Sequence, residues 1–293
     1  MASMQRYTWL GVSSIVIWAS LVAVIKLVSE QLSPIQSIAM IYSFSAITIV
    51  MMLGLPDLKQ MPKAYLYGCG ALFVAYEILF LSAVAFSESR EQVLVIAMIN
   101  YLWPPLMIVF SILFKQLSCR PLAMVGFVLA VVGLMMVVNP QVTEPLKMLA
   151  VLKQNPMAYA FALAGAIIWP YYSLLTKRYA EGHNAVAFFF LISASVLWLL
   201  HLALRESFVM PSLTWWGVIV VAGALIGLAY SNWNQSMQFG NAQLLILATY
   251  FMPVLSSLMS MCILDVQPQL SFWFGASLLT MGAIICWKNT ANR

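Results

Sequence analysis

The sequence predicts an all-α integral membrane protein with ten transmembrane helices, arranged as two inverted five-helix repeats around a central cavity. Composition is the first observation behind this prediction: 63% of the residues are hydrophobic and only 8% are charged. Soluble domains carry about 25% charged residues, so this chain lacks the polar surface that water requires. The second observation is that two similar halves each contain five hydrophobic segments. An odd number of crossings inverts the second half in the bilayer.

The internal repeat is visible as residues that recur about 150 positions later in the chain. Four separate stretches agree on nearly the same offset, which indicates a duplicated gene. The matched pairs, 151 or 149 positions apart, are Trp18 and Trp169, Lys26 and Lys177, Tyr101 and Tyr250, Pro104 and Pro253, Gly126 and Gly275, and Gly133 and Gly282. We therefore predict a first five-helix repeat over residues 1–138, a connector over 139–156 and a second, inverted repeat over 157–293.

Each predicted span has about 20 mainly apolar residues, the length that crosses a bilayer core. The predicted spans are 8–28, 34–54, 65–86, 93–114, 122–138, 157–177, 185–204, 214–238, 242–264 and 270–287. The first is too long for the core of a signal peptide, so we expect it to be retained as a helix. Residues 146–153 of the connector are expected to form a short helix on the membrane surface.

Lysine and arginine residues indicate the orientation, because cytoplasmic loops carry more of them. With a cytoplasmic N-terminus, nine of the 14 fall on the cytoplasmic side and five on the other. The nine are Arg6, Lys59, Lys63, Lys115, Arg120, Lys177, Arg178, Lys288 and Arg293. The sequence therefore predicts that both termini are cytoplasmic.

Glu77 is the one carboxylate that we place in the interior of a predicted span. A charge at that depth is costly, so this side chain should face the bundle interior or a solvated cavity. Two interpretations stay open. Glu77 is either a ligand-binding or proton-carrying acid, or a hydrogen-bonded carboxyl group that only pins neighbouring helices together.

The eighth predicted span is unusually polar near its end. Ser231, Asn234, Gln235 and Gln238 follow the spacing of one helical face, so that face should point inward. Such side chains either hydrogen-bond neighbouring helices or line a solvated binding cavity. The clustering of four on one stripe favours the cavity, and we expect Asn232 and Asn234 to bind the substrate.

Prolines occur near the middle of three predicted spans. Each removes one backbone hydrogen bond and frees the carbonyl four residues earlier, which lipid cannot satisfy. Because two of the breaks occupy matching repeat positions, they should flank one central site. A static kink that only shapes packing is the alternative for each proline. The residues expected at hinges or helix breaks are Pro104, Pro105, Pro170 and Pro253.

Aromatic residues gather at mid-span, although tyrosine and tryptophan usually lie at the ends of membrane helices. At that depth their OH and NH groups need polar partners. Any one of them could be ordinary core packing, but as a set they predict an aromatic-lined pocket. The expected substrate-binding residues, with their polar neighbours, are Trp18, Tyr76, Glu77, Asn100, Tyr101, Trp103, Trp169, Tyr172, Asn232, Asn234 and Tyr250.

Signatures of other functional classes are missing from the sequence. It has no HExxH motif, no Walker-type phosphate loop and no serine elbow, so we predict neither an enzyme nor an ATP-driven pump. The four cysteines show no CxxC pair and no metal spacing with histidine. We expect packed thiols, no metal, no cofactor and no nucleic-acid partner, and we favour a monomer. The paired glycines should let the fifth and tenth spans pack closely, either on each other or on a second protomer.

Five short stretches, spread over nearly the whole chain, resemble segments of one transporter family. They are Ile41-Tyr42-Ser43, Ala75-Tyr76-Glu77, Asn100-Tyr101-Leu102-Trp103-Pro104, Ala229-Tyr230 with Asn232-Trp233-Asn234, and Tyr250-Phe251-Met252-Pro253-Val254-Leu255-Ser256-Ser257. The family is the drug/metabolite transporter superfamily with EamA-type repeats, and within it the bacterial exporters of aromatic amino acids. The resemblance implies a basket of inverted halves in the bacterial inner (plasma) membrane, with a cavity that opens to one side at a time.

The resemblance further implies export of phenylalanine, tyrosine and tryptophan by alternating access, with tolerance for other amino acids and some organic cations. The substrate ring would stack on Tyr101, Trp103 and Trp169, and Glu77 would help to meet its charged end. The first alternative is a proton-coupled exporter of cationic drugs or other metabolites, in which Glu77 exchanges protons for cations. The second is a membrane protein that transports nothing, such as a receptor or a lipid-modifying enzyme.

Overall fold

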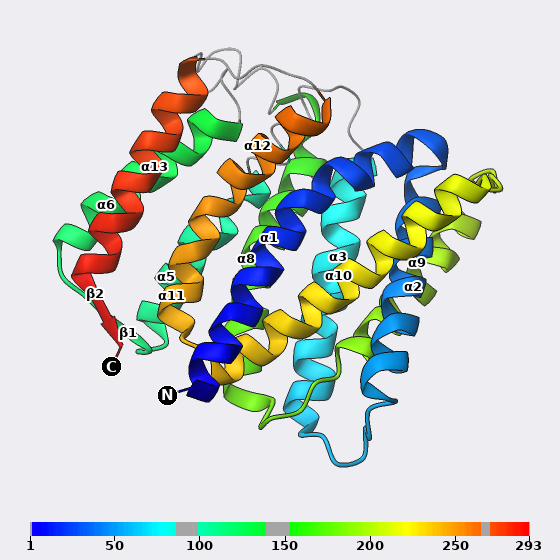
Figure 1. Ribbon diagram of the computed structural model, residues 1–293, viewed down its shortest axis with the longest axis horizontal. Coiled ribbons are helices and arrows are strands. Elements are labelled where there is room, and N and C mark those ends of the chain that lie inside the picture. The colour runs from blue at the N-terminus through cyan, green and yellow to red at the C-terminus, as the bar shows by residue number, and fades with distance from the viewer. Residues whose placement is uncertain (1, 86–95, 97–98, 139–152, 265–269, 293) are drawn as a thin grey trace. The chain divides into compact units, whose positions relative to one another are not determined.

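The computed structural model describes residues 2–85, 96, 99–138, 153–264 and 270–292. Its regular structure is helical, apart from one pair of short antiparallel strands (Figure 1). The elements are α1 (Ala2–Gln31), α2 (Pro34–Leu53), η1 (Ala64–Cys69), α3 (Gly70–Ala85), α5 (Trp103–Leu113), β1 (Leu117–Cys119), α6 (Leu122–Val138), α8 (Pro156–Tyr179), α9 (Val186–Ala203), α10 (Leu213–Phe239), α11 (Ala242–Ala248), η3 (Thr249–Phe251), α12 (Met252–Leu264), α13 (Leu270–Asn289) and β2 (Thr290–Asn292).

The helices follow the predicted spans closely. α6 has the predicted bounds, and α2, α9 and α10 differ from the prediction by one residue at their ends. α1 is longer than predicted, because a polar turn continues the helix at each end of its apolar segment. Residues 93–95 and 97–98 of the predicted span 93–114 and nearly all of the expected surface helix 146–153 lie outside the described residues. The two strands were not predicted, since three-residue strands are too short to show a period in the sequence.

The ends of α2 follow directly from its sequence. Ser33 is the N-cap residue, with extended backbone angles, and Pro34 begins the helix, where its missing N–H leaves no bond unmade. Gly54 follows the last residue at φ 79°, a left-handed conformation that glycine adopts without steric cost. Pro34–Leu53 is also one of five described helices that are long and apolar enough to cross a bilayer.

The chain divides into two compact units. Unit 1 comprises Met1–Ile78 and Leu175–Ala242, and unit 2 comprises Leu79–Leu174 and Gln243–Arg293. Unit 1 therefore contains α1, α2, η1, α9 and α10, and unit 2 contains α5, α6, α11, α12, α13 and the strands. α3 and α8 contribute residues to both units, and the first residue of α11, Ala242, belongs to unit 1. Each unit thus combines segments from both halves of the sequence, and the repeat boundaries at 138 and 157 stay a prediction.

In unit 1, α1 lies along α10, and α2 packs on both α9 and α10 (Figure 1). The α2–α10 contact is close because Gly223 has no side chain. A Cβ atom there would stand 2.7 Å from the carbonyl oxygen of Ile41. The hydroxyl of Ser45 donates a hydrogen bond to the carbonyl of Gly223 at 2.8 Å, which ties this side chain of α2 to the backbone of α10.

In unit 2, α6 and α13 lie side by side, which is the first of the two arrangements predicted from the paired glycines (Figure 1). A Cβ atom on Gly133 would stand 2.4 Å from the backbone nitrogen of Leu279. One on Gly282 would stand equally close, at 2.4 Å, to the backbone nitrogen of Ala130. Because no side chain fits at these distances, the glycines permit the close approach of the two helices.

Two helix interruptions in unit 2 occupy matching repeat positions. α5 begins at Trp103 after a turn at residues 101–102, and Pro104 and Pro105 lie in its first turn. The ninth predicted span is divided into α11 and α12 by the 3₁₀ turn η3, just before Pro253. α8 instead continues through Pro170, so the expected break is wrong there. A proline inside a membrane helix removes one bond without ending the helix when neighbours satisfy the freed group. A hinge at Pro170 stays a prediction.

Candidate functional site

Glu77 lies at the centre of a polar group in unit 1. It stands on α3 and is 1% exposed. The hydroxyl of Tyr42, on α2, donates a hydrogen bond to its Oε2 atom. Tyr230, on α10, is a second hydrogen-bonding neighbour of the carboxyl group. Among the described residues, Oε1 of Glu77 has no hydrogen-bond partner, so phenols hold the carboxyl group while one oxygen can take a further partner.

Aromatic rings enclose this carboxyl group. Phe190 of α9 stands edge-on to Tyr42, with ring centroids 4.9 Å apart, and edge-on to Tyr230 at 5.2 Å. Phe73, one helical turn before Glu77, contacts Phe190 at 5.3 Å and Tyr230 at 5.4 Å. Four helices of unit 1 thus surround one acid with apolar surface.

At Glu77, the free-energy cost of burying the carboxylate is similar in size to the stabilisation from its hydrogen bonds. In the described part of the chain, no lysine, arginine or histidine interacts with it. Taking an ion out of water costs several kcal/mol in a protein, even after relaxation. A hydrogen bond to a charged group stabilises that group by about 1.5–3 kcal/mol, so the two phenols stabilise the carboxylate by roughly 3–6 kcal/mol. These terms are of similar size, so a further partner at Oε1 would shift the balance between the protonated and the ionised carboxyl group.

Two further expected site residues join this group. The indole of Trp18, on α1, stands 5.0 Å from the ring of Tyr230. Tyr76, the neighbour of Glu77 in the chain, is 8% exposed and close enough to Tyr42 and Tyr230 to interact with both electrostatically. The fold of unit 1 therefore brings Trp18, Tyr76 and Glu77 together.

The polar stripe of α10 attaches a turn to the helix. Nδ2 of Asn234 donates to the hydroxyl of Tyr65 at 2.9 Å, and that hydroxyl also accepts from the backbone nitrogen of Ala185 at 2.9 Å. Nε2 of Gln238 donates to Oδ1 of Asn234 at 2.8 Å, and its Oε1 accepts from the backbone nitrogen of Gly182 at 2.8 Å. Bonding between segments accounts for these contacts, and substrate binding by Asn234 stays a prediction.

The neighbouring polar residues of α10 also have structural partners. Oγ of Ser231 accepts from Nδ2 of Asn184 at 2.8 Å, which extends the same network to the α8–α9 turn. Nδ2 of Asn232 lies on another face, 3.4 Å from the hydroxyl of Ser13 on α1. These contacts hold α10 to its neighbours within unit 1.

Three tyrosines of unit 1 were not among the expected site residues. Tyr42 falls in the middle of a predicted span, which is the criterion that selected Tyr76. Tyr230 directly precedes the polar stripe of its helix, so the sequence also pointed to it. Tyr65 lies in η1, a π-helical turn, and such a turn leaves no mark in the hydropathy pattern.

Unit 2 holds the second aromatic group of the expected site. The indoles of Trp103, on α5, and Trp169, on α8, stand edge-on with centroids 6.4 Å apart. The ring of Tyr172, one turn further along α8, lies 5.3 Å from that of Trp169. All three are at most 3% exposed. Trp103 and Trp169 are edge-to-face, whereas Trp169 and Tyr172 are tilted by 35°, and an aromatic cluster of this kind suits a further ring.

The other expected site residues of unit 2 are polar and lie near the helix interruptions. Tyr101 hydrogen-bonds Ser256 of α12. Oδ1 of Asn100 and the hydroxyl of Tyr250 are buried and have no hydrogen-bond partner among the described residues. The Tyr250 hydroxyl lies near the thiol of Cys286 on α13. Asn100 thus offers an acceptor that suits an ammonium group, and Tyr250 offers a donor that suits a carboxylate.

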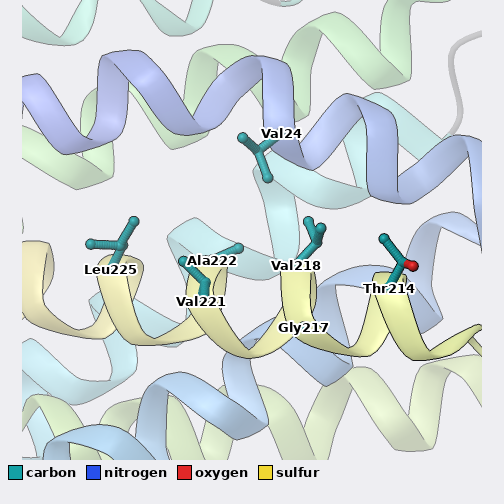
Figure 2. A pocket seen from close by; sticks show the side chains of 7 residues that line it. All are labelled: Val24, Thr214, Gly217, Val218, Val221, Ala222 and Leu225. Carbon is teal, nitrogen blue, oxygen red and sulfur yellow. The ribbon is translucent and has the colours of Figure 1, made fainter.

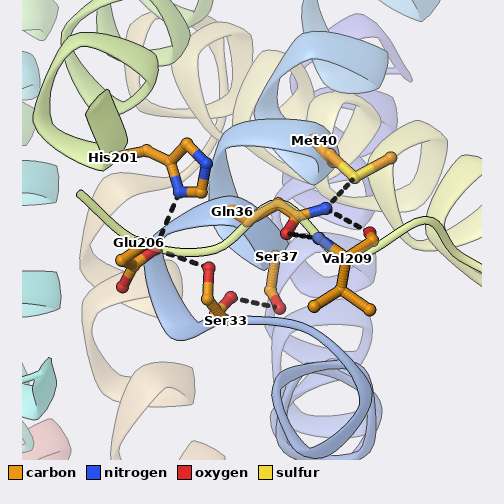
Figure 3. A network of polar contacts seen from close by, with 7 residues as sticks. All are labelled: Ser33, Gln36, Ser37, Met40, His201, Glu206 and Val209. Carbon is orange, nitrogen blue, oxygen red and sulfur yellow. Dashed lines mark hydrogen bonds and ion pairs between the residues drawn. The ribbon is translucent and has the colours of Figure 1, made fainter.

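A second polar network of unit 1 lies where α2 begins (Figure 3). Oε2 of Glu206, in the α9–α10 loop, accepts from the hydroxyl of Ser33 at 2.5 Å and lies 2.9 Å from Nδ1 of His201. The backbone N–H of Ile35 also bonds this carboxylate. Burial raises the pKa of Glu206, but the bonds from Ser33, His201 and Ile35 together outweigh burial and hold that pKa below its usual value.

Gln36 extends this network by pairing with the backbone of Val209 (Figure 3). Its Nε2 donates to the carbonyl of Val209 at 2.7 Å, and its Oε1 accepts from the nitrogen of Val209 at 2.9 Å. The side chain is fully buried. The amide therefore satisfies both backbone groups of a loop residue and fastens the α9–α10 loop to α2.

An apolar cavity of about 420 Å³ lies between α1 and α10 in unit 1 (Figure 2). Figure 2 shows Val24 of α1 facing a row of side chains on α10. The lining residues are Val24, Thr214, Gly217, Val218, Val221, Ala222 and Leu225. The hydroxyl of Thr214 is the one polar side-chain group among them. A zwitterion needs partners for both of its charges, so this cavity does not suit a free amino acid.

Metal chemistry has no site in the residues that the structure describes, where no three His, Cys, Asp or Glu side chains gather. Cys69 and Cys286 are buried, and neither forms a disulfide among the described residues. The sulfur of Cys286 donates to the carbonyl of Ala123 at 3.3 Å, so this thiol takes part in packing between α13 and α6.

Comparison with known proteins gives one family and several relatives. The family model described as EamA-like transporter family matches residues 5–139 and again residues 156–287. The aromatic amino acid exporter YddG of Salmonella typhimurium is 34% identical over 290 residues, which cover 99% of both chains. The aromatic amino acid exporter YddG of Escherichia coli is 33% identical over 287 residues, 98% of both chains. A solved crystal structure shares the fold, with a TM-score of 0.76 at 23% identity and 96% of both chains covered.

Proposed function

Since the chain belongs to the EamA-like transporter family, we propose that it exports aromatic amino acids from the cytoplasm by alternating access. The observation that carries the proposal is similarity over the full length. Relatives named aromatic amino acid exporter are 34% and 33% identical to the chain over almost every residue. Family membership also makes the chain a multi-pass membrane transporter built from inverted repeats, and not an enzyme.

The aromatic cluster of unit 2 supports the choice of substrate. Trp103, Trp169 and Tyr172 form an aromatic cluster with almost no exposed surface. A further aromatic ring gains both apolar burial and favourable ring contacts in such a set. We therefore assign these three side chains to the ring of the substrate, with Tyr101 as their neighbour.

The charged groups of the substrate also have candidate partners. In unit 2, Oδ1 of Asn100 is a buried acceptor that suits the α-ammonium group, and the hydroxyl of Tyr250 is a donor for the carboxylate. Oε1 of Glu77, in unit 1, is a buried acceptor and stays a separate candidate for a cationic group that binds within that unit. Trp18 and Tyr76 adjoin the Glu77 group and would shield its ion pair from water.

The alternating-access part of the proposal rests on the interrupted helices. Discontinuous helices at paired repeat positions are typical of the substrate sites of secondary transporters. The turn at residues 101–102 and the 3₁₀ turn η3 (Thr249–Phe251) occupy such positions. The excess of lysine and arginine on one side favours a cytoplasmic location for both termini. The bacterial relatives support the inner membrane as its location.

The direct test is transport by the purified protein in liposomes. We expect uptake of labelled phenylalanine, tyrosine and tryptophan, and competition by the unlabelled forms. Protein-free liposomes give the background. If no amino acid of a complete panel is transported, the proposed function is wrong.

An exporter of organic cations or other metabolites is the second candidate. It is favoured by the acid at Glu77, which aromatic rings surround and which no cationic side chain neutralises in the described part of the chain. Aromatic faces beside a carboxylate attract a quaternary ammonium ion. Adding such a cation to the phenylalanine assay discriminates the two: cations that outcompete every amino acid favour this candidate.

A further inference from the structure

We propose that the apolar cavity between α1 and α10 binds one acyl chain of a membrane phospholipid, with the polar part of that lipid at Thr214. The inference goes beyond the proposed function, because it requires only that the chain is a membrane protein and does not depend on which solute is transported. The cavity lies within unit 1, and none of its lining residues belongs to the expected substrate-binding set.

The length of the cavity is the first argument. Its lining residues on α10 run from Thr214 to Leu225 at the spacing of one helical face (Figure 2). The 11 steps between these two residues, at 1.5 Å each, give a length of roughly 16 Å. One leaflet of a bilayer core is about 15 Å thick, which is half of the whole core. The cavity is therefore as long as the apolar part of one leaflet.

The width of the cavity is the second argument. A volume of about 420 Å³ over this length gives a mean cross-section of roughly 26 Å², which one hydrocarbon chain can fill. An α-helix of the same length is about 10 Å across with its side chains and needs roughly three times that volume. A helix from a second copy of the chain therefore does not fit.

The chemistry of the lining excludes water as the occupant. A buried water molecule needs two to four polar partners, and among the lining side chains only Thr214 offers a polar group. An empty space would deprive the surrounding side chains of packing contacts. Methylene groups need no hydrogen bond, and the hydroxyl of Thr214 can donate to an ester carbonyl at the end of the same chain.

The open side of the cavity faces the bilayer. α10 is one of the described helices that are long and apolar enough to cross a membrane, and the predicted span begins at Thr214. Val221 is 58% exposed, whereas its neighbour Ala222 is 1% exposed, so the cavity runs inward from the surface of this helix. Leu213 and Val220, which are also exposed on α10, are apolar. This surface therefore suits contact with hydrocarbon.

The two helices part along the cavity because a close contact lies beyond its end. Oγ of Ser14, on α1, donates to the carbonyl of Ala229 at 2.8 Å. Ala229 lies one turn past Leu225, toward the C-terminus of α10. At Gly217, near the other end, a Cβ atom would meet nothing within 4 Å, so the space beside this residue is open.

Photolabelling tests the site in the intact protein. The protein is reconstituted in vesicles of phosphatidylethanolamine and phosphatidylglycerol, in which a small share of the phosphatidylethanolamine carries a diazirine on one acyl chain. After illumination, we expect more label on residues 214–225 than on other membrane-spanning segments. The wild type should also retain phospholipid through washing in mild detergent, which mass spectrometry of the extracted lipid measures.

Gly217→Leu places a side chain in the cavity. Because that side chain enters open space, the variant should unfold at the wild-type temperature and yet lose the retained phospholipid and the excess label on α10. Gly68→Leu is the matched control and should keep both. A Cβ atom on Gly68 also meets nothing within 4 Å, but this residue lies on η1, outside the lining.

Val221→Asn is a second variant that does not depend on filling the space. It puts an amide of similar size beside the acyl chain, which cannot hydrogen-bond it, so retention of phospholipid should fall severalfold. Retention at the wild-type level by both Gly217→Leu and Val221→Asn would overturn the proposal.

The remaining outcomes identify other occupants. Equal labelling of every membrane-spanning segment would show that only the ordinary surrounding lipid touches α10, and it would overturn the proposal. Displacement of the label by tryptophan or by tetraphenylphosphonium would also overturn it, because the cavity would then belong to the transport path. The labelling and retention assays do not measure transport, so their failure leaves amino acid export untouched, and a failure of export leaves the lipid site untouched.

Discussion

Gly133 of α6 lies so close to Leu279 of α13 that a methyl group on the glycine would stand 2.4 Å from the Leu279 nitrogen. The same closeness recurs along the pair, where a Cβ atom on Gly126 would stand 2.7 Å from the carbonyl oxygen of Gly282. Lipid tails are as apolar as the helix surfaces, so helix association in a bilayer depends on close packing of this kind. The α6–α13 contact therefore depends on four positions that carry no side chain.

Gly133→Ala should push these two helices apart. We expect the free energy of unfolding to fall by about 1–3 kcal/mol, the usual cost of an added methyl group in a packed core. Thermal unfolding of the detergent-solubilised protein measures the change. Gly217→Ala on α10 is the control, since a Cβ atom there meets nothing within 4 Å. Equal unfolding temperatures for the two variants would contradict the packing argument.

Glu206 supplies a cap for α2 from a distant loop, and its effect should depend on pH. Ser33 makes no side-chain capping bond to its own helix and instead donates to Glu206, which also accepts from the N–H of Ile35. The folded-state pKa of Glu206 lies below its usual value, despite burial, because these bonds and that from His201 favour the carboxylate. The stabilisation is therefore complete above the unfolded-state pKa and disappears as pH falls through the folded-state pKa.

Glu206→Gln should lower the free energy of unfolding at neutral pH by about 0.5–2 kcal/mol, the range of a lost helix cap. On acidification, wild-type stability should fall toward that of the variant, so that the two unfolding curves converge. Unfolding temperatures measured over a pH series give the comparison. Glu181→Gln should keep the wild-type pH dependence, and a constant gap between wild type and Glu206→Gln would refute the cap.

Tyr65→Phe should damage stability more than transport. The variant keeps the ring but removes the acceptor for Nδ2 of Asn234 and for the backbone nitrogen of Ala185. A buried donor without a partner costs about 1–3 kcal/mol, so unfolding should occur at a clearly lower temperature. If the α10 stripe is structural, the KM for tryptophan of the folded fraction stays near the wild-type value. A large rise in KM would instead favour a binding cavity at this stripe.

Hydropathy predicted the helices well because the bilayer fixes their length, and α6 begins and ends where the apolar run does. It did not reveal that α8 passes Pro170 without a break, because that depends on how neighbouring groups satisfy the freed carbonyl. Hydropathy also did not predict the strands β1 and β2, because the residues that pair in them lie far apart in the sequence, as Leu117 and Asn292 do.

The candidate site was predictable in its residue types and less so in its contacts. Glu77 was identifiable from the sequence, because an acidic side chain in a membrane span is costly and therefore rare. The polar stripe of α10 was assigned to a cavity, although Asn234 is bonded to Tyr65. Periodicity shows which side chains share a helical face but not what that face contacts. Hydrogen bonding between helices and a solvated cavity therefore give the same sequence pattern.

Trp169→Ala gives the most direct test of the aromatic cluster in unit 2. The ring of Trp169 contacts both Trp103, at 6.4 Å, and Tyr172, at 5.3 Å, so its loss opens the surface that we assign to the substrate ring. Aromatic pairs contribute about 0.5–1.5 kcal/mol beyond burial, so the KM for phenylalanine and tryptophan should rise by about tenfold. Trp169→Phe keeps a ring and should recover most of that loss, and Trp9→Ala, which removes an indole that is 64% exposed on α1, should leave the KM unchanged. Transport assays in liposomes provide these values. An equal rise for amino acids without a ring would show that Trp169 supports the fold of unit 2 and does not select the substrate.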